Sequence, residues 1–285
     1  MQYTFTKMHG AGNDYIYMDG FHGNPLPPDI AAAAVEWSRR RFSVGSDGII
    51  LILPHDTCDA EMRIFNADGS EGKMCGNGIR CVAKYLYDNG ICRKKTMRIM
   101  TKSGERIVEV RTDESDTVRS AIVGMGVPCF VPSEIPLMAD SADDLQLVLP
   151  TGESLTVSCV SVGNPHAVCF VEDVDRLELE RIGPMCEKHP AFPEQVNTEF
   201  VQVLNSTTLK FRVWERGSGE TLACGTGISA ACAVAVRKGI CPADTPITVH
   251  ARGGTLVITV TKNGITMEGP AEISYRGVVE YHGED

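Results

Sequence analysis

The stretch MCGNGIRC, residues 74–81, decides how this chain is organised, because its pattern returns in the other half of the sequence. The second stretch, ACGTGISAAC, covers residues 223–232. Both contain Cys-Gly-x-Gly-Ile, beginning at Cys75 and at Cys224. An apolar helical pattern follows the glycines in both, which predicts two helices that each begin at a cysteine. The sequence therefore predicts two related halves with one cysteine-glycine turn in each.

Each predicted helix has a readable end. After the first turn, apolar residues follow the i, i+3, i+4, i+7 spacing from Ile79 to Leu86, and Asn89-Gly90 ends the helix. After the second turn, GISAACAVAVRKG (227–239) is small and apolar on nearly all sides, which indicates a helix buried within a sheet-lined core. The two helices are thus predicted to be the centres of their halves.

Short strands surround these helices in the predicted fold. Gly, Asp-Gly and Pro separate β-branched or alternating segments, and Asn-Gly at 263–264 indicates a hairpin. The expected strands are 3–8, 14–19, 48–53, 60–65, 97–101, 105–111 and 119–124, then 155–162, 166–171, 199–204, 208–214, 246–250, 255–260 and 264–268. Further helices are expected at 30–41 and, from a weaker pattern, at 174–188. The Gly- and Pro-rich segment 125–136 is expected to connect the two halves. The fold class is mixed α/β (α+β) in two domains.

The amino-acid composition of the chain argues against several classes of function. The chain has 285 residues, 43% of them hydrophobic, and a net charge of -10 without a basic stripe, which argues against nucleic-acid binding. No apolar run approaches the ~20 residues of a membrane span, and the N-terminus lacks a secretory pattern. A cytoplasmic location is expected. The 11 cysteines form no Cys-x-x-Cys pair, so no metal site is predicted.

A cysteine at a helix N-terminus is suited to proton transfer. Unpaired N–H groups and the helix dipole favour the thiolate, and the same N–H groups can hold a carboxylate. If two such halves face each other, one thiolate can remove an α-proton while the opposite thiol protonates the other face of the carbon. This arrangement suits inversion at the α-carbon of an amino acid, and it needs two bases rather than the electron sink of a cofactor.

Other interpretations of the two cysteines stay open at this point. They could be buried structural cysteines, a redox pair or metal ligands. GTGISA (225–230) also matches the Gly-x-Gly-x-x-Ala dinucleotide pattern, but neither a leading strand nor a βαβ unit accompanies it.

At these residues the sequence closely resembles the diaminopimelate epimerase family, whose members are cofactor-independent. The resemblance rests on six blocks in the family's order. They are FTKMHGAGNDY (5–15), RRRFSVGSDGI (39–49), IFNADGSEGKMCGNGIRC (64–81), VSVGNPH (160–166), VNTEF (196–200) and ERGSGETLACGTG (215–227). It implies two pseudo-symmetric domains with the active site between them: residues 1–124 with a returning C-terminal strand at about 277–285, and residues 125–276.

The resemblance also implies roles for matching residues. Cys75 and Cys224 correspond to the acid/base thiols, assisted by His166 and Glu215. The carboxylate cradles correspond to Gly76, Asn77, Gly225 and Thr226. The substrate contacts correspond to Asn13, Asn66, Asn164, Asn197, Glu215 and Arg216. Physically, a guanidinium suits a distal carboxylate, and asparagines suit a zwitterionic centre.

Taken singly, these residues have simpler interpretations. Asn13 and Asn66 lie in segments that are also typical of turns. His166 could be a core histidine, and Glu215 and Arg216 could be a solvated charge pair. Where some family members carry Gln, this chain has Gly48, so no side-chain contact is expected there; residues 43–47 remain a candidate lining of the site.

The resulting hypothesis is epimerisation of LL-diaminopimelate to the meso form, in lysine and peptidoglycan-precursor biosynthesis, by a homodimer without a cofactor. The alternatives are a racemase of another amino acid on the same fold and, from a different class, a thiol redox or binding protein.

Overall fold

The computed structural model describes residues 1–282 and divides the chain into two compact units. Unit 1 comprises residues 1–123 and the described residues from 268 onward, and unit 2 comprises residues 124–267. The chain passes from unit 1 to unit 2 near the end of strand β8 and returns within strand β17. No helix among residues 1–282 is long and apolar enough to cross a membrane.

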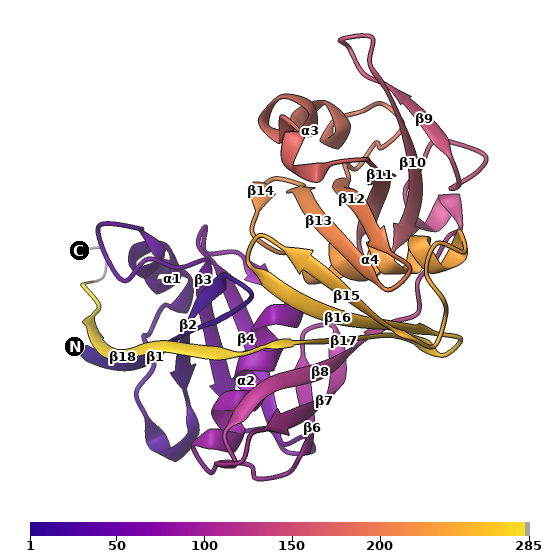
Figure 1. Cartoon of the computed structure of the whole chain (residues 1–285). Helices are drawn as coiled ribbons and strands as arrows, with labels where there is room; N and C mark the ends of the chain where they lie inside the picture. Colours follow the sequence, from indigo (N-terminus) through magenta and orange to yellow (C-terminus); the bar gives the residue numbers. More distant parts are fainter. Residues whose placement is uncertain (283–285) are drawn as a thin grey trace. The chain divides into compact units, whose positions relative to one another are not determined.

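Unit 1 consists of strands that surround one long helix. Its elements are β1 (Gln2–Gly10), β2 (Asn13–Asp19), η1 (Phe21–Gly23), α1 (Ile30–Ser38), β3 (Gly48–Leu53), β4 (Ala60–Asn66), β5 (Glu71–Gly72), α2 (Gly76–Asp88), β6 (Thr96–Thr101), β7 (Gly104–Thr112), β8 (Val118–Gly126) and β18 (Glu272–Glu280). Figure 1 shows α2 among these strands, and it contacts β1, β2 and β7. On α2 the apolar residues Ile79, Val82 and Leu86 are fully buried, as their helical spacing predicts.

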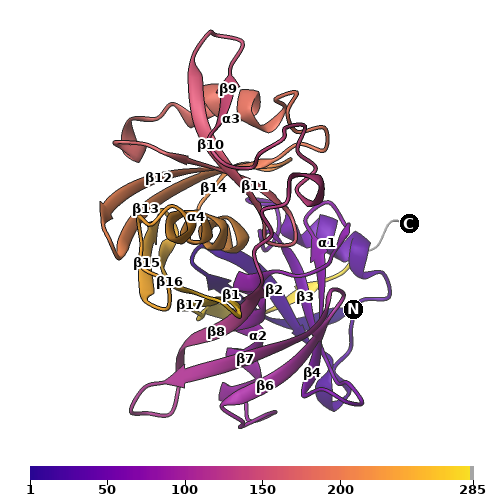
Figure 2. The same cartoon turned by 90° about the vertical axis from the view of Figure 1, so that its right-hand side faces the viewer.

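Unit 2 repeats this plan. Its elements are η2 (Pro132–Glu134), β9 (Leu145–Val148), β10 (Ser154–Ser161), β11 (Pro165–Phe170), η3 (Val174–Arg176), α3 (Leu179–Glu187), β12 (Asn197–Asn205), β13 (Thr208–Glu215), β14 (Gly219–Thr221), α4 (Gly225–Arg237), β15 (Pro246–Ala251), β16 (Gly254–Thr261) and β17 (Gly264–Pro270). Figure 2 shows α4 surrounded by strands of its unit, and it contacts β10, β11, β12 and β16. The small side chains of α4 allow this close packing on several sides.

The strand pairing identifies equivalent positions in the two units. In unit 1, β2 runs parallel to β3, and β3 runs antiparallel to β4; in unit 2, β11, β12 and β13 are paired in the same way. Tyr17 pairs with Ile50 as Val168 pairs with Glu199. The equivalent pairs that bear on function are Asn13 and Asn164, Tyr15 and His166, Gly48 and Asn197, Ile50 and Glu199, Asn66 and Glu215, Cys75 and Cys224, and Arg80 and Ser229.

Most expected elements are present, with differences at their ends. The helix expected at 30–41 ends at Ser38, and Arg39 leaves the helical region with ψ 101°. The helix expected at 174–188 is two elements, because Leu177 and Glu178 adopt non-helical backbone angles between η3 and α3. The crossover 125–136 is shorter than expected, since β8 continues to Gly126.

The C-terminal strand begins earlier than the sequence indicates. β18 starts at Glu272 rather than about 277 and pairs antiparallel with β1 from Gln2 to His9. Its exposed and alternating side chains give a weak hydrophobic pattern, so its place in the fold depends on pairing with β1. Residues 283–285 of the expected strand lie outside the described residues.

Candidate active site

Cys75 is the residue that precedes α2, and its side chain caps the helix. Its Sγ accepts a hydrogen bond from the backbone N–H of Gly78 at 3.3 Å. The same Sγ donates to Oδ1 of Asn13 at 3.2 Å. The thiol is half-buried, and the N-terminal N–H groups of α2 favour its ionised form. The structure thus brings Asn13 and Cys75, both predicted site residues, into direct contact.

A network of charged residues orients Asn13. Its Nδ2 donates to Oδ2 of Asp47 at 2.7 Å, and that carboxylate also accepts from the backbone N–H of Asp14. Arg40 binds Asp47 at 2.9 Å and Asp14 at 2.6 Å. Asp47 belongs to the segment 43–47 that the sequence indicated as a candidate lining of the site, whereas no role was predicted for Arg40. Because Asp47 holds the amide nitrogen, the amide oxygen of Asn13 faces the thiol.

A buried arginine, Arg80, forms hydrogen bonds with the glycine turn at the start of α2. Arg80 is fully buried; it donates to the carbonyl oxygen of Gly76 at 3.2 Å and to Oδ1 of Asn77 at 2.9 Å. Burial lowers the pKa of its guanidinium. The side chain of Asn77 therefore serves the turn itself, and what the turn offers to a ligand is its backbone N–H groups.

Asn66 and Gly48 face each other at the start of β3. They are partners in the β3–β4 pairing, and Nδ2 of Asn66 donates to Oγ of Ser70 at 3.0 Å. A Cβ at Gly48 would lie 2.1 Å from the carbonyl oxygen of Phe65, and its φ is +150°. The backbone conformation of this chain at Gly48 therefore leaves no room for a side chain.

Cys224 occupies the equivalent place in unit 2, in a different electrostatic setting. It precedes α4, is buried, and its Sγ lies 3.4 Å from Oγ1 of Thr226. Burial raises the pKa of this thiol well above its usual value, and the charges of Glu215 and Glu199 raise it further. The two thiols are therefore inequivalent.

Asn197 forms hydrogen bonds with two backbone segments, one at Pro165 and one at Arg216. Its Nδ2 donates to the carbonyl oxygen of Pro165 at 2.9 Å, and its Oδ1 accepts from the backbone N–H of Arg216 at 3.0 Å. The guanidinium of Arg216 donates to the carbonyl oxygen of Glu194 at 2.8 Å. Glu215 accepts from the hydroxyl of Thr221. Asn197 thus fixes the backbone at Arg216, next to Glu215.

His166 belongs to a buried cluster. Its Nδ1 lies 2.7 Å from Oε1 of Glu199, and its Nε2 lies 2.9 Å from Oδ1 of Asn164. Both His166 and Glu199 are fully buried. Glu199 lies in the VNTEF block, but no role was predicted for it, because an alternating strand pattern does not distinguish a buried glutamate from an exposed one.

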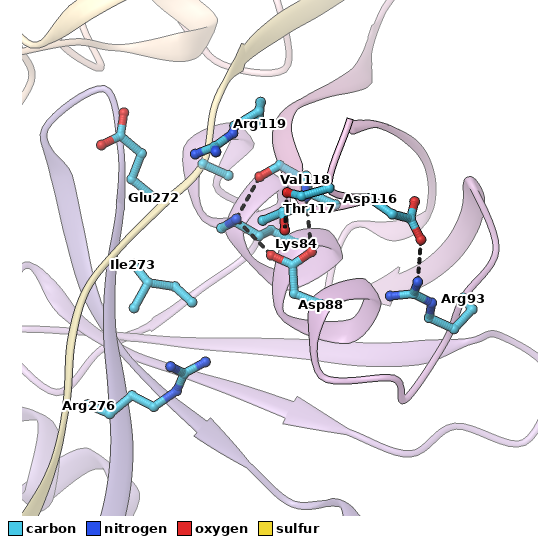
Figure 3. Close-up of a pocket in the computed structure, with 12 residues that line it drawn as sticks. Lys84, Asp88, Arg93, Asp116, Thr117, Val118, Arg119, Glu272, Ile273 and Arg276 are labelled. Carbon is cyan, nitrogen blue, oxygen red and sulfur yellow. Dashed lines mark hydrogen bonds and ion pairs between the residues drawn. The ribbon is translucent and has the colours of Figure 1, made fainter. Parts of the chain in front are cut away.

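One pocket of unit 1 lies away from these residues, at the C-terminal end of α2 (Figure 3). It has a volume of about 700 Å³ and contains none of the predicted site residues. Its charged groups are largely paired: Lys84 with Asp88 at 2.7 Å, and Arg93 with Asp116. Among residues 1–282, no cluster of His, Cys, Asp or Glu could hold a metal ion.

The different settings of the two thiols predict different reactivity. We expect iodoacetamide at neutral pH to alkylate Cys75 on the order of tenfold faster than Cys224, because Cys75 is only half-buried, whereas Cys224 is buried beside Glu215 and Glu199. The raised pKa of Cys224 keeps it protonated, so its rate should increase only at higher pH. Peptide mass mapping over time measures both rates, and fully buried Cys81, on the same helix as the Cys75 turn, is the unreactive control. Faster alkylation of Cys224 would contradict this assignment.

Comparison with known proteins defines first the fold class. The chain is similar to a PhzF-family phenazine biosynthesis protein from Bacillus anthracis, with a TM-score of 0.71 and 16% identity over 99% of this chain and 100% of that one. It is also similar to a hydroxyproline epimerase from Agrobacterium vitis, with a TM-score of 0.70 and 15% identity over 98% and 92% of the chains. The fold is thus the two-domain α/β fold of these proteins.

Sequence similarity then gives the family. The diaminopimelate epimerase family profile matches residues 5–131 and 158–274. The chain is 46% identical to the diaminopimelate epimerase of Bacillus mycoides over 98% of both sequences. It is 45% identical to that of Acetivibrio thermocellus over 97% of this chain and 98% of the other. The chain belongs to the diaminopimelate epimerase family.

Proposed function

We propose that this protein is an isomerase that epimerises LL-diaminopimelate to meso-diaminopimelate, a step of lysine and peptidoglycan-precursor biosynthesis. The observation that carries the proposal is the placement of Cys75 and Cys224 at the N-termini of the two equivalent helices α2 and α4, in a member of this family. The substrate is a small amino acid with an ammonium and a carboxylate at both ends.

The proposed mechanism uses one thiol on each face of the α-carbon. One cysteine, as thiolate, removes the α-proton; the other, as thiol, donates its proton to the opposite face, so the two exchange protonation states in each turnover. Charge that develops on the substrate carboxylate would be stabilised by the backbone N–H groups at Gly76-Asn77 and Gly225-Thr226. Each proton removed is matched by a proton added, so no redox cofactor is required.

Substrate recognition is proposed to involve the polar side chains around the two turns. Arg216 offers a guanidinium to the distal carboxylate, and Glu215 a carboxylate to an ammonium. Asn13, Asn66, Asn164 and Asn197 are proposed to contact the substrate or to hold the residues that do. Support comes from unit 1, where Asn13 touches Cys75, and from unit 2, where Asn197 fixes the backbone of Arg216.

Deuterium incorporation tests the proposed reaction. The reduced, metal-free and PLP-free protein is incubated with LL-diaminopimelate in D₂O, and α-proton loss is followed by NMR together with chiral separation of the products. We expect meso product that carries deuterium at the inverted carbon. Exchange with a different amino acid only would replace the substrate but keep the mechanism. Absence of exchange with every amino acid would favour a redox or binding protein instead.

We further propose that the protein is a cytoplasmic homodimer. This rests on its membership of the family and on the composition of the chain. Light scattering of the purified protein should give the mass of two chains, about twice 30.9 kDa.

A further inference from the structure

A carboxylate and an imidazole are buried together in unit 2, where the fold does not require them. Glu199 and His166 are both fully buried, 2.7 Å apart, and Oε2 of Glu199 has no hydrogen-bond partner among the described residues. At the equivalent positions unit 1 has Ile50 and Tyr15. Burial of a carboxylate is costly, and it raises the pKa of Glu199. Since an aliphatic residue serves the same strand position in unit 1, the pair has a use other than packing.

The pair lies against the thiol-bearing turn. A Cβ at Gly227 would lie 2.7 Å from Oε1 of Glu199 and 3.3 Å from Cβ of Cys224. In unit 1, a Cβ at Gly78 would meet the Ile50 side chain at 2.6 Å and Cβ of Cys75 at 3.4 Å. The second glycine of the turn thus lies against the same strand position in both units, and in unit 2 that position carries a carboxyl group.

The hydrogen bonds of His166 fix the orientation of Asn164. Oδ1 of Asn164 can only accept, so the Nε2 of His166 that contacts it carries a proton. One further proton is shared between Nδ1 and Oε1 of Glu199, and the pair is neutral overall whichever atom holds it. With its oxygen engaged, Asn164 presents its NH₂ group, for which no protein acceptor exists among the described residues.

The equivalent asparagine of unit 1 is turned the other way. Asp47 accepts from Nδ2 of Asn13, so the amide oxygen of Asn13 is directed to the thiol of Cys75. One unit therefore presents an acceptor from this position and the other a donor. An amide oxygen suits an ammonium group, and an amide NH₂ group suits a carboxylate.

We infer that Glu199 is a positioning residue that, through the ring of His166, turns the Asn164 amide so that its NH₂ group is offered to a substrate carboxylate. The inference rests on the proposed function, because it assumes that Asn164 meets substrate. The other titratable groups whose charges interact with Glu199 or lie beside it are Glu215 on β13, Cys159 on β10 and Cys224 before α4.

Two substitutions separate orientation from packing. Glu199→Ile installs the residue type of the equivalent position in unit 1 and removes the partner of Nδ1. Glu199→Gln keeps a hydrogen-bonding side chain that can donate to Nδ1 and so preserve the Nε2 proton. We expect Glu199→Ile to raise KM for diaminopimelate on the order of 10- to 100-fold, with a smaller effect on kcat, and Glu199→Gln to retain KM within about threefold. Ile50→Val, at the equivalent position of unit 1, is the packing control.

Nitrogen-15 NMR of the histidine rings gives a readout that does not depend on activity, with His166→Gln to assign the signals. In the unaltered protein we expect the signal of a protonated Nε2, because this nitrogen faces the amide oxygen of Asn164. In Glu199→Ile the Nδ1 signal should shift. An unprotonated Nε2 in the unaltered protein, or a Glu199→Ile variant with unchanged ring signals and KM, would overturn the inference. If the protein epimerises no diaminopimelate but the ring signals behave as stated, the proposed function fails while the orienting role of Glu199 survives.

Discussion

Replacement of either Cys75 or Cys224 by alanine is expected to lower kcat for epimerisation on the order of 10³-fold or more. Each thiol supplies one of the two proton transfers, and water cannot replace a positioned acid or base at this carbon. The measurement is the D₂O assay with LL- and meso-diaminopimelate as separate substrates. Loss of inversion in both single variants is the expected result.

Two further cysteines on the same helices serve as controls. Cys81 on α2 and Cys232 on α4 are fully buried, and burial raises the pKa of both thiols, that of Cys81 to about 11. Cys81→Ala and Cys232→Ala should retain kcat within a few-fold, since neither thiol is at a helix N-terminus. Inversion at near-normal rates in Cys75→Ala or Cys224→Ala would rule out the two-thiol mechanism.

Gly48→Ala is expected to destabilise the protein by about 3 kcal/mol or more. The new Cβ would lie 2.1 Å from the carbonyl oxygen of Phe65 and 2.9 Å from Cα of Asn66, and these are backbone atoms that cannot rotate away. A φ of +150° adds strain for any residue with a Cβ. Urea unfolding followed by circular dichroism gives the free energy of unfolding.

A second glycine in a strand provides the control for Gly48. Gly124 lies in β8, and a Cβ there meets nothing within 4 Å. Gly124→Ala should change the free energy of unfolding by less than about 1 kcal/mol. If both substitutions cost the same, the close approach of β3 and β4 at Gly48 is not what requires glycine. Because Gly48 pairs with Asn66, a relaxed backbone in Gly48→Ala should also displace Asn66.

The central helices and most strands could be predicted from the sequence, because local rules specify them. A cysteine-glycine turn followed by 3.6-residue spacing gives the start of α2 and α4, and β-branched runs between Gly and Pro give the strands. The prediction was wrong where local signals were weak. The 174–188 segment breaks into η3 and α3, and β18 begins at Glu272 because its partner β1 lies at the other end of the chain.

The family and the position of the two cysteines were likewise available from the sequence, since six ordered blocks carry them. The side-chain contacts were not. Two hydrogen bonds illustrate this: Asn13 binds Asp47, and His166 binds Glu199. Each pair is more than 30 positions apart in the sequence, and no local pattern encodes such a pair.

By itself, the sequence determined that this protein has two related halves, each with a cysteine at the start of a central helix, because turns, caps and periodicity act over a few residues. Only the tertiary structure decided how the halves differ. Strand pairing brings Ile50 to one cysteine turn and Glu199 to the other, and it sets the asparagines in opposite orientations. The physical reason is that burial, charge pairing and amide orientation depend on neighbours that the fold, and not the chain order, brings together.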